Sequence, residues 1–294
     1  MKRIDFENGT VTNNILSAAL PMLVAQILNL LYNIVDRIYI ARIHDIGTTA
    51  LGAVGLCFPI IMIITAFSNL FGSGGAPIFS INRGKGDSRT ADMIMNTAFT
   101  MLCGSAAVLM LIGFLFARPL LTLFGASDDA LVYAYPYLMI YLLGTLPSMI
   151  ATGMNPFINA QGYAIIGMLS VTVGAVTNII LDPIMIYGIG PVPEMGVEGA
   201  AYATVIGQVA SAVLLFIFHT KLNKEFAHGT KYMKPEGGII KEIYSIGLPA
   251  IIAQALMSIM VYVMNLILKF NPSAQTAYGL FYKVQQFVLF LAFG

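Results

Sequence analysis

The stretch Ile15–Arg42 constrains the fold of this chain more than any other. From Ile15 to Val35 it carries no charge, and ~20 predominantly apolar residues are what an α-helix needs to cross the hydrocarbon core of a bilayer. Similar stretches recur along the chain, and of its 294 residues 58% are hydrophobic and only 10% are charged. A soluble domain has about 25% charged residues, so we predict an all-α polytopic membrane protein.

Polar residues follow one face of this first helix. Gln26, Asn29, Asn33 and Asp36 succeed one another at steps of 3, 4 and 3 residues, which places them on one side of a helix. A carboxylate within a membrane span usually faces a bundle interior or a wet cavity and marks an ion or substrate path. Asp36 is therefore a candidate coupling residue. An ion pair with a neighbouring helix, or snorkelling to the outer interface, would also explain it.

Seven further helices are predicted along the chain. They are expected at Leu51–Ile81, Ala91–Ala117, Ala130–Ala160, Tyr163–Tyr187, Ala200–Thr220, Ile243–Phe270 and from Ala274 onwards. Pro21 and Pro249 fall inside the first and the seventh helix, where the missing N–H predicts a kink. Ten of the 15 Lys and Arg residues lie in the N-terminus, the turn 82–90 and the segment 221–242. The positive-inside rule therefore places the N-terminus in the cytoplasm.

An internal repeat predicts the domain organisation. Leu20-Pro21, Ala25-Gln26 and Leu28 recur as Leu248-Pro249, Ala253-Gln254 and Leu256, at a constant offset of 228 residues. Six helices separate the two copies, so both enter the membrane in the same direction, as in a parallel repeat. We expect a six-helix N-lobe at 1–222, a cytoplasmic linker at 223–240 and the first two helices of a second lobe at 241–294.

A second intramembrane carboxylate lies on the fifth predicted helix. Asp182 follows Asn178 by four residues, so the two share a helix face. Counting a helix rise of 1.5 Å per residue from the predicted helix ends places Asp36, Asp182 and Thr204 at similar depths in the membrane, on three different helices. These oxygen-bearing side chains, with the Asn178 amide, suit sodium or a proton as the bound cation. The alternative is that Asp182-Pro183 merely ends a helix.

Further polar faces occur on the fourth and sixth helices. The fourth carries Thr145, Ser148, Thr152, Asn155 and Asn159 at steps of 3 or 4, and the sixth carries Thr204, Gln208 and Ser211. Such faces can line a cavity, or they can join helices by hydrogen bonds.

Several motifs together resemble the multidrug and toxic compound extrusion (MATE) family. They are LPMLVAQILNLLYNIVDRIYIAR, GKGD, ARPLLTLFGAS, NPFINAQG, TNIILDPIMIYG, GVEGAAYATVIGQ and IGLPAIIAQ, which extend over essentially the whole chain. The resemblance implies twelve helices in two six-helix lobes, of which this chain would contain the N-lobe and the start of the C-lobe. It also implies export of organic cations in exchange for sodium or protons.

The resemblance also implies roles for individual residues. Asp36, Asn178, Asp182 and Thr204 match the N-lobe cation site, and Pro21 matches the bend of the first helix. The polar faces and this resemblance together predict a substrate cavity lined by Gln26, Asn29, Tyr32, Asn33, Tyr137, Thr152, Asn155 and Gln208. Of these, Tyr137 and Asn155 are the weaker matches to family residues near the N-lobe cavity. Another branch of the family uses a glutamate on the seventh helix, where this chain has Gln254 and Ser258 and no acid.

The sequence features bear on three candidate functions. The first is a cation-coupled antiporter of amphipathic organic cations, with no cofactor beyond the coupling ion and no nucleic-acid partner, monomeric and located in the cell membrane. The second is a lipid-linked oligosaccharide flippase of the same superfamily, which needs basic residues facing its cavity, whereas Arg37, Lys269 and Lys283 are the few candidates here. The third, an intramembrane aspartyl protease, lacks its Gly-x-Gly-Asp pattern, so we predict that the protein is not an enzyme.

Overall fold

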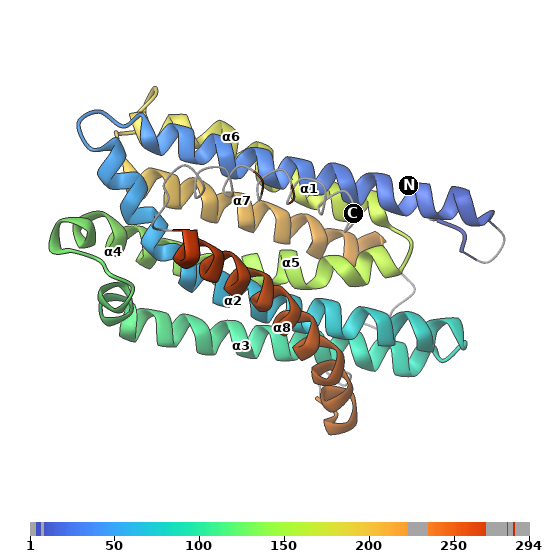
Figure 1. Cartoon of the computed structure of the whole chain (residues 1–294). Coiled ribbons are helices and arrows are strands. Elements are labelled where there is room, and N and C mark those ends of the chain that lie inside the picture. The colour runs from blue at the N-terminus through green and yellow to red at the C-terminus, as the bar shows by residue number, and fades with distance from the viewer. Residues whose placement is uncertain (1–3, 7–8, 223–234, 269–280, 282–284, 286–294) are drawn as a thin grey trace.

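The computed structural model describes residues 4–6, 9–222, 235–268, 281 and 285, and Figure 1 shows their arrangement. The helices are α1 (Val11–Ala41), α2 (Gly47–Gly84), α3 (Ser88–Leu123), α4 (Asp128–Leu143), α5 (Thr145–Ala160), α6 (Ala164–Tyr187), α7 (Val197–Ile217), the short π-helix η1 (Phe218–Leu222) and α8 (Gly237–Leu268). The described residues contain no strand. The chain is an all-helical bundle, as predicted.

Several of these helices can span a membrane. By length and hydropathy, α1, α2, α3, α6 and the stretch Val197–Lys221 qualify, and α4 and α5 qualify together as one bent span. In a bilayer core no water satisfies the backbone, so helices, which bond internally, are the structure expected there. The protein is therefore a multi-pass membrane protein.

Side-chain oxygens cap three helix N-termini. Thr10 Oγ1 accepts a hydrogen bond from the backbone N–H of Asn13 at 3.4 Å and so begins α1. Asp87 caps α3 by accepting from the N–H and the hydroxyl of Thr90 at 3.0 and 2.6 Å, and these bonds hold the pKa of Asp87 below its usual value. Ser127 caps α4. Caps of this kind satisfy N–H groups that a helix leaves unpaired.

The predicted single helix at Ala130–Ala160 is wrong, because the structure divides it at Gly144. α4 and α5 meet there at an angle of 57°. Pro147, in the first turn of α5, has no N–H to offer, and its ring clashes with a carbonyl four residues earlier in a continuous helix. Gly144 adds backbone freedom at the same place. The Gly144-x-x-Pro147 spacing was the sequence signal for this break.

Glycines allow close approach of the helices around α2. A Cβ on Gly72 would lie 2.8 Å from the carbonyl oxygen of Gly153 on α5, and one on Gly74 would lie 2.4 Å from that of Ile243 on α8. On the α8 side, a Cβ on Gly247 would lie 2.3 Å from the carbonyl oxygen of Leu70. Small residues at helix contacts are typical of membrane bundles. Helices there associate through van der Waals packing, because the surrounding lipid is as apolar as the helices and the hydrophobic effect does not drive them together.

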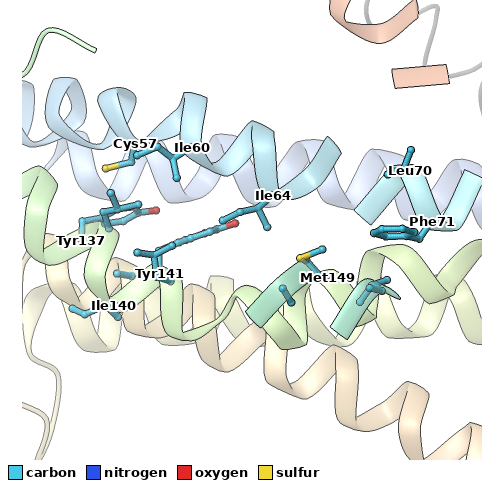
Figure 2. Packing of buried hydrophobic residues seen from close by; sticks show 14 of the residues in the cluster. Cys57, Ile60, Ile64, Leu70, Phe71, Tyr137, Ile140, Tyr141 and Met149 are labelled. Atoms are coloured by element: carbon cyan, nitrogen blue, oxygen red, sulfur yellow. The ribbon is translucent and has the colours of Figure 1, made fainter. Parts of the chain in front are cut away.

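The bundle core lies between α2 and the helices around it. Figure 2 shows part of this core, with Phe71 and Ile64 of α2 on one side and Met149 and Tyr141 of α5 and α4 on the other. All four of these side chains are buried or nearly so. Aromatic contacts add to the packing, as in the edge-to-face pair Phe79–Phe157 with ring centroids 5.7 Å apart, a geometry that aromatic pairs favour.

The start of α8 belongs to the same core. α8 begins at Gly237, earlier than the predicted Ile243, and Ile239 and Ile243 are buried in the hydrophobic cluster of the bundle. Figure 1 shows α8 crossing α2, against which it packs. Pro21 and Pro249 lie inside α1 and α8 without interrupting either helix. Apart from residues 281 and 285, the helix expected from Ala274 lies outside the described residues.

Candidate cation site between α1, α6 and α7

The two intramembrane carboxylates lie side by side. α1 packs along α6, as Figure 1 shows, and this brings Asp36 and Asp182 within hydrogen-bonding reach of each other. Asp182 is 0% exposed, and Asp36 is partly buried. Two carboxyl groups can share a hydrogen bond only when one of them carries a proton, so a pair this close offers a site for a proton or another cation between its oxygens.

The side chain of Asn178 connects the acid pair to α7. Its Nδ2 donates to Asp182 Oδ1 at 3.1 Å, one turn along α6, and to Thr204 Oγ1 at 3.3 Å on α7. Asn178 is buried, and both donor hydrogens of its amide are used by these bonds. The orientation of the amide is thereby fixed, with Oδ1 turned away from its two partners.

Three buried oxygens at this place have no hydrogen-bond partner. They are Asp36 Oδ1, Asn178 Oδ1 and Asp182 Oδ2. A buried acceptor without a partner costs roughly 1–3 kcal/mol, so the arrangement is incomplete without a donor or a cation. Oxygen atoms of carboxylates and amides are the ligands that hard cations take. The four residues predicted as the cation site are thus brought together by the fold.

Two tyrosines lie near the acid pair. Tyr32 of α1 is close to both carboxylates, and Tyr137 of α4 is close to Asp36. Tyr137 stacks on Tyr141, with ring centroids 6.3 Å apart and an interplanar angle of 19°, as Figure 2 shows. Tyr141 was missed from the sequence, although its spacing of four residues from Tyr137 places it on the same face of α4.

A polar contact links these tyrosines to the break in the fourth span. The hydroxyl of Tyr141 interacts with the side chains of Gln208 on α7 and Ser148 on α5. Gln208 Oε1 is buried without a hydrogen-bond partner, and it lies so close to Gly144 that a Cβ there would be 2.3 Å away. A side chain at Gly144 would displace the Gln208 amide from this position. Gln208, predicted as a cavity residue, thus contacts Tyr141, which stacks on Tyr137 near Asp36.

Other residues predicted for the cavity lie elsewhere. Asn33 donates to the carbonyl and side-chain oxygens of Asn29 at 2.7 and 2.9 Å, and this exposed pair is satisfied within α1. Asn155 donates to Gly167 O and Ser170 Oγ on α6 at 3.0 and 3.3 Å, so it joins two helices. Two further side chains complete the set: Thr152 is exposed and Gln26 is half-buried.

Close packing of α6 on α7 determines the geometry at Asn178. A Cβ on Gly207 would lie 2.7 Å from the carbonyl oxygen of Gly174 and 3.5 Å from Asn178 Cβ. Ser211 Oγ donates to Ser170 O across the same interface at 2.7 Å. The backbones are thus in contact one turn from Thr204, which is why its hydroxyl reaches the Asn178 amide.

Gly207→Ala in the full-length protein is expected to lower its stability by about 1–3 kcal/mol, because the helices must separate to admit the methyl group. Thermal unfolding in detergent measures the effect. Gly104→Ala is the matched control, since a Cβ at this exposed helical position meets nothing within 4 Å. An alanine there should be neutral or slightly stabilising. Equal melting temperatures for the two variants would contradict the prediction.

A comparison with family models places the chain. The MatE model matches residues 21–184, more than half of the chain, and includes Asp36, Asn178 and Asp182. The chain belongs to the MatE family. The resemblance seen in the motifs is therefore confirmed.

Curated relatives of this MatE chain are multidrug exporters. It is 28% identical over 283 residues to the multidrug export protein MepA of Staphylococcus haemolyticus, covering 96% of this chain and 61% of the relative. It is 28% identical over 285 residues to MepA of Staphylococcus aureus, again covering 96% and 61%. The chain thus spans about three fifths of the length of these relatives.

Solved structures share its fold. A MATE transporter in the bent conformation superposes with a TM-score of 0.86 at 25% identity, covering 97% of this chain and 63% of the other. A MATE protein in complex with MaD3S gives 0.89 at 24% identity. A transporter of the MOP superfamily from Pyrococcus furiosus, described as having a binding pocket of reversed polarity, gives 0.87 at 24% identity and covers 99% and 64%.

Proposed function

We propose that the full-length protein is a cation-coupled antiporter that exports amphipathic organic cations. The observation that carries this proposal is the proximity of Asp36 and Asp182, two carboxyls from different helices. Each of them, like the neighbouring Asn178, has one buried oxygen without a hydrogen-bond partner. Membership of the MatE family and similarity to multidrug export proteins support the direction and the substrate class. The substrates themselves, the cell membrane as location, the cytoplasmic N-terminus and the monomeric state belong to the same proposal.

The mechanism follows from competition for one negatively charged site. Sodium or a proton bound between Asp36, Asp182 and Asn178 neutralises the site and stabilises one arrangement of the lobes. A cationic substrate close to the same carboxylates stabilises the other arrangement. Each ligand then shifts the same equilibrium in opposite directions, and the coupling is reciprocal. The chain's own residues supply the charge, and the ring of Tyr32, near both carboxylates, suits an organic cation.

The flippase alternative has less support at this site. A lipid-linked oligosaccharide carries a pyrophosphate, which needs basic residues near the binding centre. The guanidinium of Arg37, next to Asp36 in the sequence, lies over the ring of Phe58 at 5.7 Å from its centroid. Arg37 is exposed on α1, and the carboxylates of Asp36 and Asp182 repel phosphate.

Vesicles that contain the full-length protein test the proposal. A sodium gradient and a proton gradient are imposed in separate experiments, with the ion more concentrated inside the vesicles. A fluorescent organic cation outside the vesicles is the probe, so that outward flow of the ion would drive its uptake. We expect one of the two gradients to drive uptake of the probe against its own gradient. Dissipation of that gradient with an ionophore should stop uptake. Transport that neither gradient drives would contradict the antiporter proposal.

A further inference from the structure

A second cavity lies far from the acid pair, where the turn between α2 and α3 meets the start of α8. Its volume is about 760 Å³. Its walls come from the end of α2, the first turn of α3 and the first turns of α8, and none of the residues of the cation site lines it. α2 and α3 are membrane spans, so their connecting turn and this cavity lie at one end of the bundle, outside the hydrocarbon core.

The cavity has charges of opposite sign on opposite walls. Lys85 and Arg89 stand on the α2–α3 side, and Glu236 and Glu242 stand on the α8 side. All four are exposed. No ion pair joins the two walls in the part of the chain that the structure describes. The remaining acid there, Asp87, accepts two hydrogen bonds from Thr90 as the cap of α3.

Apolar side chains form the floor and the rim of the cavity. Ile78 and Ile239 are buried at its base, each 7% exposed. Ile81 and Ile246 also line it and are 55% and 38% exposed. The exposed isoleucines lie beside a charged cleft at the end of the membrane spans. They provide an apolar surface for lipid acyl chains, next to the charged groups that can bind the phosphate and amine of a head group.

We propose that this cavity binds a phospholipid with a zwitterionic head group, of the aminophospholipid class. The lipid phosphate pairs with Lys85 and Arg89, and the primary ammonium donates hydrogen bonds to Glu236 and Glu242. The acyl chains lie along Ile81 and Ile246. A purely anionic lipid is disfavoured by the two glutamates, and a purely cationic amphiphile is disfavoured by the two basic residues.

Such a lipid would connect two parts of the chain that the sequence assigns to different lobes. Its phosphate would be held by the first predicted lobe and its ammonium by the first helix of the second. Occupancy of the cavity therefore stabilises the present position of α8 against α2 and α3. This site is independent of the cation site, so it does not rest on the proposed antiport.

Native mass spectrometry of the full-length protein with added lipids tests the proposal. The probes are phosphatidylethanolamine, phosphatidylcholine, whose quaternary ammonium has no N–H donor, and anionic phosphatidylglycerol. We expect phosphatidylethanolamine to bind best. The variant Lys85→Gln/Arg89→Gln should bind it more weakly, by roughly fivefold for each cation removed. The variant Glu236→Gln/Glu242→Gln should lose the preference for phosphatidylethanolamine over phosphatidylglycerol.

Matched double variants control for the change in surface charge. Lys221→Gln/Lys241→Gln and Glu194→Gln/Glu198→Gln each remove two charges of one sign from exposed positions outside the cavity, and each should keep the lipid preference of the wild type. All substitutions are at exposed sites, so folding should be preserved, which size-exclusion chromatography checks. Equal or tighter binding of phosphatidylglycerol by the wild type would overturn the proposal. So would unchanged binding in both cavity variants, the result expected if another segment of the full-length chain fills the cavity.

Discussion

Cells that express the full-length protein with Asp36→Asn are expected to export no more drug than cells without the protein. Asparagine has the same shape as aspartate, but its neutral amide can neither take up a proton nor neutralise the charge of a bound cation. The affinity for the coupling ion should fall roughly 10–100-fold, because a charged hydrogen-bonding partner is worth about 1.5–3 kcal/mol. Drug efflux from loaded cells measures the effect, with the amount of protein in the membrane determined in parallel.

The structure supplies a matched control for this substitution. Asp45 lies just beyond the end of the same helix, where it pairs with His44 at 2.7 Å and is 82% exposed. Its φ of 63° is one that asparagine tolerates, so Asp45→Asn should leave both folding and export unchanged. Wild-type efflux in the Asp36→Asn protein would remove the basis of the proposed coupling. Loss of that protein from the membrane would show instead that Asp36 is needed for folding.

Asn178→Ala is expected to have the second-largest effect. It removes the single amide that donates to both Asp182 and Thr204, and it leaves one buried and one half-buried acceptor without this partner. Each such loss costs roughly 1–3 kcal/mol. We therefore expect a lower melting temperature together with a loss of export, since the Asp182 carboxylate is no longer held in place and one of the unpartnered oxygens is gone.

Two variants show whether the effect is specific. Thr204→Val removes one of the two bonds with little change of shape, so its loss of stability should be about half as large. Asn96→Ala removes an amide that donates within its own helix, to Asp92 O at 2.8 Å, and it should leave export intact. If Asn178→Ala kept full export, the amide would have no part in the cation site. Efflux and thermal unfolding of the same preparations decide between these outcomes.

The all-helical membrane fold was predictable from the sequence, and so was the proximity of the residues proposed for the cation site. Asp36, Asn178 and Asp182 stand out because charged and amide groups in apolar spans are costly and so are placed for a reason. Their depths could be counted along the helices from the loops, and the structure brings all three together with Thr204. The roles of these residues stay predictions. The order of the helices was also predictable, since their apolar stretches are long and separated by clear loops.

What could not be predicted depends on contacts between distant parts of the chain. Asn155 and Asn33 have the same residue type and spacing as cavity residues, yet one joins α5 to α6 and the other is satisfied within α1. Periodicity gives the face of a helix but not the neighbour on that face. The break at Gly144 was missed because a continuous apolar stretch outweighed the Gly and Pro within it. Tyr141 became relevant only through its contacts with Gln208 and Ser148.

The contact between Gly74 and Gly247 has a consequence for motion. With no side chain on either glycine, the backbones of α2 and α8 lie against each other, and a Cβ on Gly74 or Gly247 would overlap a carbonyl oxygen of the opposite helix. Neither helix can slide along the other or rotate about its own axis without forcing larger neighbouring side chains into this gap. Tilting about the glycine pair keeps the spacing unchanged. Rearrangements between these two helices should therefore pivot at this point, and their amplitude should grow towards both membrane surfaces.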